Sequence, residues 1–201
     1  MEKHPVIIPS LLLLGAVIFN LLFLWPEVAV EAPVLNDNVL HLTLIERTVE
    51  ALEKGENPTD HWVPYFVQGY PLFHHYQHLP HLVTALLYKM LGRAFPLPRL
   101  FNGLRYLLLS TFPLSIYWAG RRLGFEARAA ALAGVLASLL STEGLYGFDL
   151  SSYVWRGYGM YTQLWGMWLL GPSLAGLYVT LREGRAYAGT VALLSATLLS
   201  H

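Results

Sequence analysis

The sequence predicts an all-α membrane protein with several transmembrane helices, and three observations lead to that prediction. Hydrophobic residues make up 55% of the 201 positions, and only 13% of the residues are charged. A soluble domain usually carries about 25% charged residues, so this chain holds roughly half the usual charge. Long uncharged runs recur along the chain, and acidic and basic residues gather in different segments between them.

The charge balance and the cysteine content exclude several classes of protein. Thirteen Lys and Arg balance thirteen Asp and Glu, so no overall field attracts a nucleic acid. The high apolar content excludes a disordered chain and most cytosolic enzymes. Because cysteine is absent, the chain has no disulfide scaffold, thiolate metal site or thiol nucleophile.

The first predicted span covers residues 6–25, which carry no charge. At a rise of about 1.5 Å per residue, a helix of this length crosses a hydrocarbon core of about 30 Å. A signal peptide is the alternative, but its apolar core would hold only about 7 to 15 residues. Trp25, Pro26 and Glu27 also leave no small-residue cleavage site, so we expect a retained anchor.

Charged residues predict which side of the membrane each loop occupies. Residues 26–60 contain eight of the thirteen acids and only two basic residues. Basic residues favour the cytoplasmic side, so we expect the loop at 26–96 to lie outside an inner membrane and the N-terminus to lie in the cytoplasm. Two basic clusters are expected to be cytoplasmic, and they consist of Arg121, Arg122 and Arg128, and of Arg182 and Arg185.

The remaining spans follow from this placement. We expect them at residues 97–120, 125–142, 159–181 and 186–201, with a second outer loop at 143–158. The apolar piece at 81–92 is short and contains Lys89, so we expect a helix that lies in the outer interface without crossing. The last apolar stretch reaches His201 without a polar flank, which predicts that a C-terminal remainder follows.

An amphipathic helix is predicted at the start of the first outer loop. Asp37 at its beginning suits an N-terminal cap, and Gly55 and Pro58 end it. Asp37 and His41 are four residues apart on one face, where a carboxylate and an imidazole could instead share a proton or a metal ion. Its apolar face is formed by Val39, Leu42, Ile45, Val49 and Leu52.

Five histidines follow among aromatic residues and prolines, at positions 61, 74, 75, 78 and 81. His74, His78 and His81 would share a face and suit a transition metal if the next helix began early. Pro80 interrupts that run, and histidine is common at membrane interfaces. A polar, pH-sensitive pocket is therefore favoured over a zinc site.

The second outer loop carries Glu143, Asp149 and Arg156 among glycines and aromatic residues. Glycines let a backbone approach a ligand closely, and aromatic rings stack on sugar faces or lie among lipid headgroups. An aromatic belt with a flexible turn is the simpler interpretation. It leaves two carboxylates and an arginine beside the bilayer unexplained, so this loop is a candidate part of a site.

The order of these parts resembles the GT-C glycosyltransferases, which are polytopic membrane enzymes. The phrases that carry the likeness are GYPLFHHYQHLPHLVTALLYKMLG, PRLFNGL, VWRGYGMYTQLWG and the terminal LLSH. Within that superfamily the chain is most similar to the bacterial and archaeal membrane proteins called 6-pyruvoyl-tetrahydropterin-synthase-related. That name implies no pterin chemistry.

The resemblance implies transfer of a sugar from a polyprenyl-phosphate donor to a glycan, lipid or protein acceptor outside the membrane. Asp37 would be the general base or, with His41, a ligand of a divalent metal, and Asp149 or Glu143 would complete the acidic site. Arg105 has an alternative role, in which it snorkels to the outer interface. The residues implied in binding the substrate or the carrier phosphate are Arg99, Arg105, Arg156, His74, His75, His78 and Tyr70.

Two other functions stay open at this point. A transporter or lipid flippase would need ionisable residues in the middle of its spans, and the predicted spans contain almost none. A non-catalytic scaffold for envelope enzymes is compatible with the same sequence.

Overall fold

The computed structural model describes residues 7–29, 37–65, 68–137 and 161–201. Glu143, Asp149 and Arg156 of the predicted second outer loop lie outside the described residues. The described part is helical, and its β pairing is confined to one isolated bridge between Val63 and Tyr70. The predicted all-α class is therefore confirmed.

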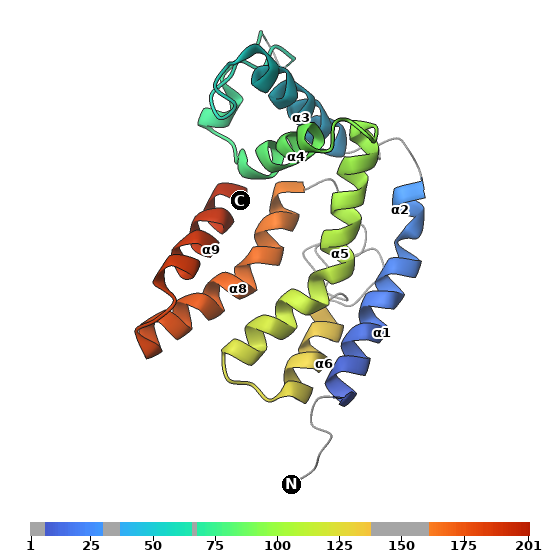
Figure 1. Cartoon of the computed structure of the whole chain (residues 1–201), viewed down its shortest axis with the longest axis vertical. Helices are drawn as coiled ribbons and strands as arrows, with labels where there is room; N and C mark the ends of the chain where they lie inside the picture. Colours follow the sequence, from blue (N-terminus) through green and yellow to red (C-terminus); the bar gives the residue numbers. More distant parts are fainter. Residues whose placement is uncertain (1–6, 30–36, 66–67, 138–160) are drawn as a thin grey trace.

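Apolar helices form a bundle beneath a smaller helical layer (Figure 1). Helix α5 packs against α1, α6 and α8, and α9 packs on α8, so α5 lies at the centre of the bundle. The ends of four of these helices lie within two residues of the predicted runs, because long uncharged runs favour helices. The run predicted at 125–142 is described only as far as Ala137. The bundle consists of α1 (Ile7–Phe23), α5 (Leu97–Arg122), α6 (Ala127–Ala137), α8 (Tyr161–Glu183) and α9 (Tyr187–Ser200).

The first predicted span is interrupted near its outer end. Helix α1 stops at Phe23, and a short helix, α2 (Trp25–Ala29), follows after Leu24. Pro26 has no backbone N–H to continue the hydrogen bonds of the preceding helix, which accounts for a break at this place. The side chain of Leu24 is buried in a core cluster with α5 and α8, so the break itself is packed against the bundle.

Close packing inside the bundle depends on Gly134 of α6. A Cβ atom on this glycine would lie 2.6 Å from the carbonyl oxygen of Pro113 in α5 and 3.1 Å from a methyl group of Leu13 in α1. Only a residue without a side chain fits where these three helices meet.

The smaller layer consists of α3 (Asp37–Lys54), the 3-10 turn η1 (Leu72–His74) and α4 (Leu79–Met90), at one end of the bundle (Figure 1). Helix α3 packs against α4 and also contacts α5 and α8. One buried cluster joins the layer to the bundle, and it contains Leu42, Ile45, Val49, Ala85, Leu97, Phe101 and Tyr161. We call α3, η1 and α4 the outer layer.

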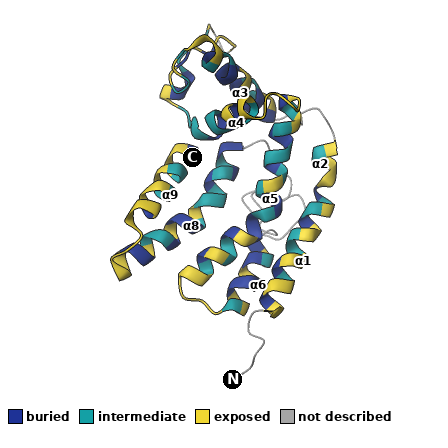
Figure 2. Cartoon of the chain, viewed as in Figure 1, coloured by how far each residue is buried: buried dark blue, intermediate teal, exposed yellow. Residues whose placement is uncertain are grey.

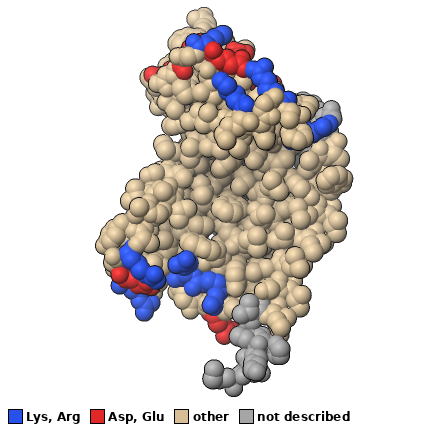
Figure 3. All heavy atoms as spheres, viewed as in Figure 1, with Lys and Arg blue, Asp and Glu red and all other residues tan. Residues whose placement is uncertain are grey.

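Charged side chains lie at the two ends of the molecule. On the face drawn in Figure 3 they gather over the outer layer and at the opposite end, and the surface between them is uncharged. Figure 2 shows exposed residues along the outer faces of α1 and α9. Large apolar side chains are exposed on the bundle helices, among them Leu11, Ile18, Leu114, Leu170 and Leu198.

One helix of the described part, α8, is long and apolar enough to cross a membrane by itself. Helices α1, α6 and α9 are apolar but shorter in the described part.

Candidate functional site

The candidate site is a buried group of polar and aromatic side chains between the outer layer and the bundle. His41 comes from α3, His81 and Thr84 come from α4, and Tyr161 is the first residue of α8. All four side chains are buried. We call these four residues the histidine–tyrosine cluster.

Two histidines form the centre of this cluster. Nδ1 of His41 lies 3.0 Å from Nε2 of His81, and Nδ1 of His81 lies 3.1 Å from the carbonyl oxygen of Gln77. Because a carbonyl only accepts, neutral His81 carries its proton on Nδ1, and its Nε2 accepts a hydrogen bond from the Nδ1–H of His41. Burial, and after it the nearby His41, hold the pKa of His81 well below its ordinary value of 6.5. His81 is therefore neutral at pH 7.

Tyr161 joins the histidines to the bundle. The hydroxyl of Thr84 donates to the carbonyl oxygen of Pro80 at 2.7 Å, so the Tyr161 hydroxyl donates to Thr84 Oγ1, also at 2.7 Å. The Tyr161 ring lies 5.9 Å from His41 and 4.8 Å from Phe101 of α5, measured between ring centroids. One continuous set of side chains thus connects α3, α4, α5 and α8.

Arg105 of α5 is next to this set and is only 4% exposed. Its guanidinium carbon lies 5.6 Å from the Phe101 ring centroid, and Nη1 donates to Oδ1 of Asn102 at 3.2 Å. The neighbouring Tyr106 donates to the carbonyl oxygen of Leu21 near the outer end of α1. Arg105 therefore lies buried at the level where α1 ends.

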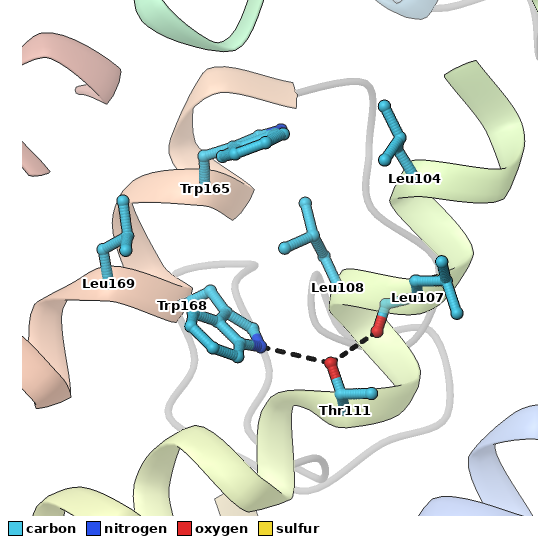
Figure 4. Close-up of a pocket in the computed structure, with 7 residues that line it drawn as sticks. All are labelled: Leu104, Leu107, Leu108, Thr111, Trp165, Trp168 and Leu169. Atoms are coloured by element: carbon cyan, nitrogen blue, oxygen red, sulfur yellow. Dashed lines mark hydrogen bonds between the residues drawn. The ribbon is translucent and has the colours of Figure 1, made fainter. Parts of the chain in front are cut away.

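An apolar cavity of about 200 Å³ lies between α5 and α8 (Figure 4). One residue of its lining, Leu104, directly precedes Arg105 in the sequence. The indole Nε1 of Trp168 donates to Thr111 Oγ1 at 3.2 Å, and Thr111 donates to the carbonyl oxygen of Leu107 at 2.6 Å. These bonds satisfy polar groups that would otherwise face the cavity. Its lining consists of Leu104, Leu107, Leu108, Thr111, Trp165, Trp168 and Leu169.

The two residues of the predicted acid and metal pair differ in exposure. Asp37 lies exposed in the first turn of α3, and His41 is buried one turn later with Nδ1 turned to His81. Asp37 is thus accessible to solvent, whereas one nitrogen of His41 is already used. Residues 7–29, 37–65, 68–137 and 161–201 contain no group of three or more His, Asp or Glu placed to hold a metal ion.

The predicted shared face of His74, His78 and His81 does not form. Helix α4 begins at Leu79, with Pro80 in its first turn, where a missing N–H costs nothing. His74 instead lies in η1, where Nε2 is 2.6 Å from Oδ1 of Asp60. The condition of an early helix start is not met, because Pro80 lies in the first turn of α4.

The other predicted binding residues of the first outer loop are spread over several elements. His75 is exposed after η1, and Tyr70 pairs its backbone with Val63. His78 is half-buried, with its ring centroid 6.1 Å from that of Phe73, and burial lowers its pKa. Arg99 is exposed near the start of α5. Of the predicted residues, the structure brings His41 and Arg105 to the cluster.

Sequence reasoning did not identify Thr84, Tyr161 and Trp168 as parts of the site. The available signal was the position of His81 and Thr84 on the same side of a predicted helix, three residues apart. Tyr161 and Trp168 could not be assigned because aromatic residues at the end of a span also suit a membrane interface.

No family model, curated protein or solved structure matches this chain.

Proposed function

We propose that this chain is a multi-pass inner-membrane transferase of GT-C type, which moves a sugar from a polyprenyl phosphate to an acceptor outside the cytoplasm. The observation that carries the proposal is the position of Arg105. Arg105 is buried in α5 beside Phe101, and its sequence neighbours Leu104 and Leu107 line an apolar cavity. A lipid-linked phosphate needs this combination of a cation and a hydrocarbon site.

The distribution of charge supports the membrane placement. Charged side chains at both ends and an uncharged surface between them match a bilayer with polar interfaces on each side (Figure 3). The end near Arg121, Arg128 and Arg182 is rich in arginine, which favours the cytoplasm. Residues 26–60, which include α3, contain eight of the thirteen acids and only two basic residues, so the outer layer faces outward in this proposal, with the N-terminus in the cytoplasm.

Arg105 suits the carrier phosphate. Guanidinium is always charged and presents a planar fork of N–H donors that fits phosphate oxygens in pairs. Asn102 holds one of these nitrogens at 3.2 Å and so fixes the direction of the fork. Arg105 lies eight residues into α5, about 12 Å along the helix from its outer end. That depth suits a phosphate whose lipid extends into the bilayer.

The cavity between α5 and α8 suits the lipid part of the carrier. Leucine and tryptophan side chains dominate its lining, and the polar Thr111 is hydrogen-bonded within the protein. A hydrocarbon chain there avoids water and lies against the apolar faces of these side chains. The lipid would begin at Arg105 and run past Leu108 toward Trp168.

Asp37 is the proposed general base. Its carboxylate would take the proton of the acceptor hydroxyl, whose oxygen would then attack the anomeric carbon of the sugar. The bond from that carbon to the phosphate oxygen breaks, and polyprenyl phosphate leaves with the bonding electrons. A divalent metal held by Asp37 would supply further charge for the phosphate. Glu143 and Asp149 are proposed as the other acids of this site.

The test is sugar transfer from a polyprenyl-phosphate sugar by membranes that contain the chain. Arg105→Gln removes the charge, and we expect kcat/KM for the donor to fall about 10- to 100-fold, because a charged hydrogen bond contributes about 1.5–3 kcal/mol. Arg105→Lys keeps the charge without the fork and should retain part of the activity. Arg185→Gln, at an exposed arginine that pairs with Glu183, is the matched control. Unchanged transfer by a well-folded Arg105→Gln protein would refute the proposal.

A further inference from the structure

A second apolar cavity lies at the cytoplasmic end of the bundle, between α5, α6 and α8. Its volume is about 430 Å³, within the range of about 300–1,000 Å³ that is usual for small-molecule sites. Small residues on facing helices create this space, among them Gly120, Ala129, Ala133 and Gly171. Ala129 and Ala133 are exposed, so the cavity opens to the surface of the bundle.

The lining of this cavity favours hydrocarbon over water. Its side chains are apolar throughout, with Phe125 at one end and Leu174 on the α8 side. Apolar cavities stay dry because a water molecule needs two to four polar partners. Lipid chains are the apolar molecules available to a surface that faces a bilayer.

Three arginines belong to the segment that leads from α5 into α6 beside this cavity, and none of them is part of its lining. Nη1 of Arg121 donates to the carbonyl oxygen of Phe125 at 2.9 Å, and Phe125 lines the cavity. The Arg122 guanidinium lies 5.1 Å from the ring centroid of Trp118, and Arg128 adjoins Ala129 in sequence. All three arginines are exposed, and Glu126 is the one acid among residues 121–128. The charges give a net +2 at this end (three Arg minus one Glu).

We propose that this cavity binds an acyl chain of an anionic phospholipid from the cytoplasmic leaflet, with the headgroup phosphate on Arg121, Arg122 and Arg128. Charge complementarity selects the anionic lipid, because guanidinium groups bind phosphate and the excess positive charge attracts a net negative headgroup. A zwitterionic lipid has the same chains but no net charge. The inference rests on the proposed membrane placement and is independent of transferase activity.

Native mass spectrometry of the detergent-purified full chain tests this site. The probes are phosphatidylglycerol and phosphatidylcholine with identical oleoyl chains. We expect the wild-type chain to retain phosphatidylglycerol in preference to phosphatidylcholine. Arg121→Gln combined with Arg122→Gln should reduce that preference, by about fivefold per arginine. Ala129→Leu combined with Ala133→Leu should reduce retention of both lipids, because the larger side chains occupy the cavity.

Matched controls are available at the same end of the molecule. Arg185→Gln removes a cation that pairs with Glu183, and Ala188→Leu enlarges an exposed residue of α9; neither residue lines the cavity. Both controls should behave as the wild type does. Circular dichroism and thermal melting of each variant show that it is folded.

The outcomes separate this inference from the proposed function. Equal retention of the two lipids, or an unchanged preference in the arginine variant, would overturn the lipid site. Failure to retain either lipid would overturn it and would also count against the membrane placement. Selective retention that disappears in the variants would support the site even if the chain shows no sugar transfer.

Discussion

Nδ1 of His41 lies 3.0 Å from Nε2 of His81, although the two residues are 40 positions apart in the sequence. Both side chains are buried, with exposed fractions of 1% for His41 and 0% for His81. This contact fixes α3 against α4 and places Tyr161 beside both rings. The pair also makes the stability of the outer layer sensitive to pH.

We expect the melting temperature of the detergent-solubilised chain to fall as the pH is lowered from 7.5 to 5.5. Burial lowers the pKa of His61, His78 and His81, so the unfolded chain binds protons at a pH where the folded chain does not. Stability is therefore full above the unfolded value of about 6.5 and decreases as the pH falls toward the lower folded values.

His81→Gln removes one of these titrating groups and keeps an amide that can accept from His41. The melting temperature of this variant should depend less on pH than that of the wild type. His75→Gln, at an exposed histidine, is the control and should keep the wild-type slope. Parallel slopes for wild type and His81→Gln would contradict the assignment of the pair.

Asp37→Asn separates capping from catalysis. Asn is about as good as Asp at the start of a helix, so α3 should remain folded. The amide cannot act as a base, and loss of a general base costs about 10² to 10⁴ in rate. We therefore expect unchanged circular dichroism and a large loss of sugar transfer. Transfer at the wild-type rate would leave Asp37 with a structural role alone.

Gly134→Ala is expected to destabilise the bundle by about 1–3 kcal/mol, because the new methyl group meets Pro113 and Leu13. Gly15→Ala is the matched control in α1, since a Cβ there meets no atom within 4 Å. That change should be neutral or stabilise by up to about 1 kcal/mol, because alanine favours the helix. Thermal melting should show a lower melting temperature for Gly134→Ala and an unchanged or higher one for Gly15→Ala. Equal changes in the two variants would argue against the close contact of α6 with α5.

Single cysteines in this cysteine-free chain test the membrane placement. Lys54→Cys in the outer layer and Glu126→Cys between α5 and α6 are both exposed positions. In intact cells a membrane-impermeant thiol reagent should label the cysteine at 54 and reach the one at 126 only after permeabilisation. Labelling of position 126 from outside would reverse the predicted topology.

The helices were predictable because their signals are local. Each signal depends only on neighbours in the chain, as for an uncharged run, Pro80 at a helix start, or an acid beside an apolar stripe. The predicted starts agree with the structure within two residues for α3, α5, α8 and α9. The gathering of charged residues into the segments between the apolar runs was equally visible, because it depends only on which loop each residue occupies.

The burial of particular polar residues was decided by tertiary packing. Arg47 belongs to the predicted polar side of α3, yet it is buried, donating to the carbonyl oxygen of Trp62 and pairing with Glu56. Val39 belongs to the predicted apolar side and is 41% exposed. Helix α4 and the segment that follows Gly55 cover parts of α3. The hydrophobic pattern of α3 alone does not show that these parts are buried. The contact of His41 with His81 and the burial of Arg105 arise in the same way, because each depends on which distant segment packs against the helix and excludes water.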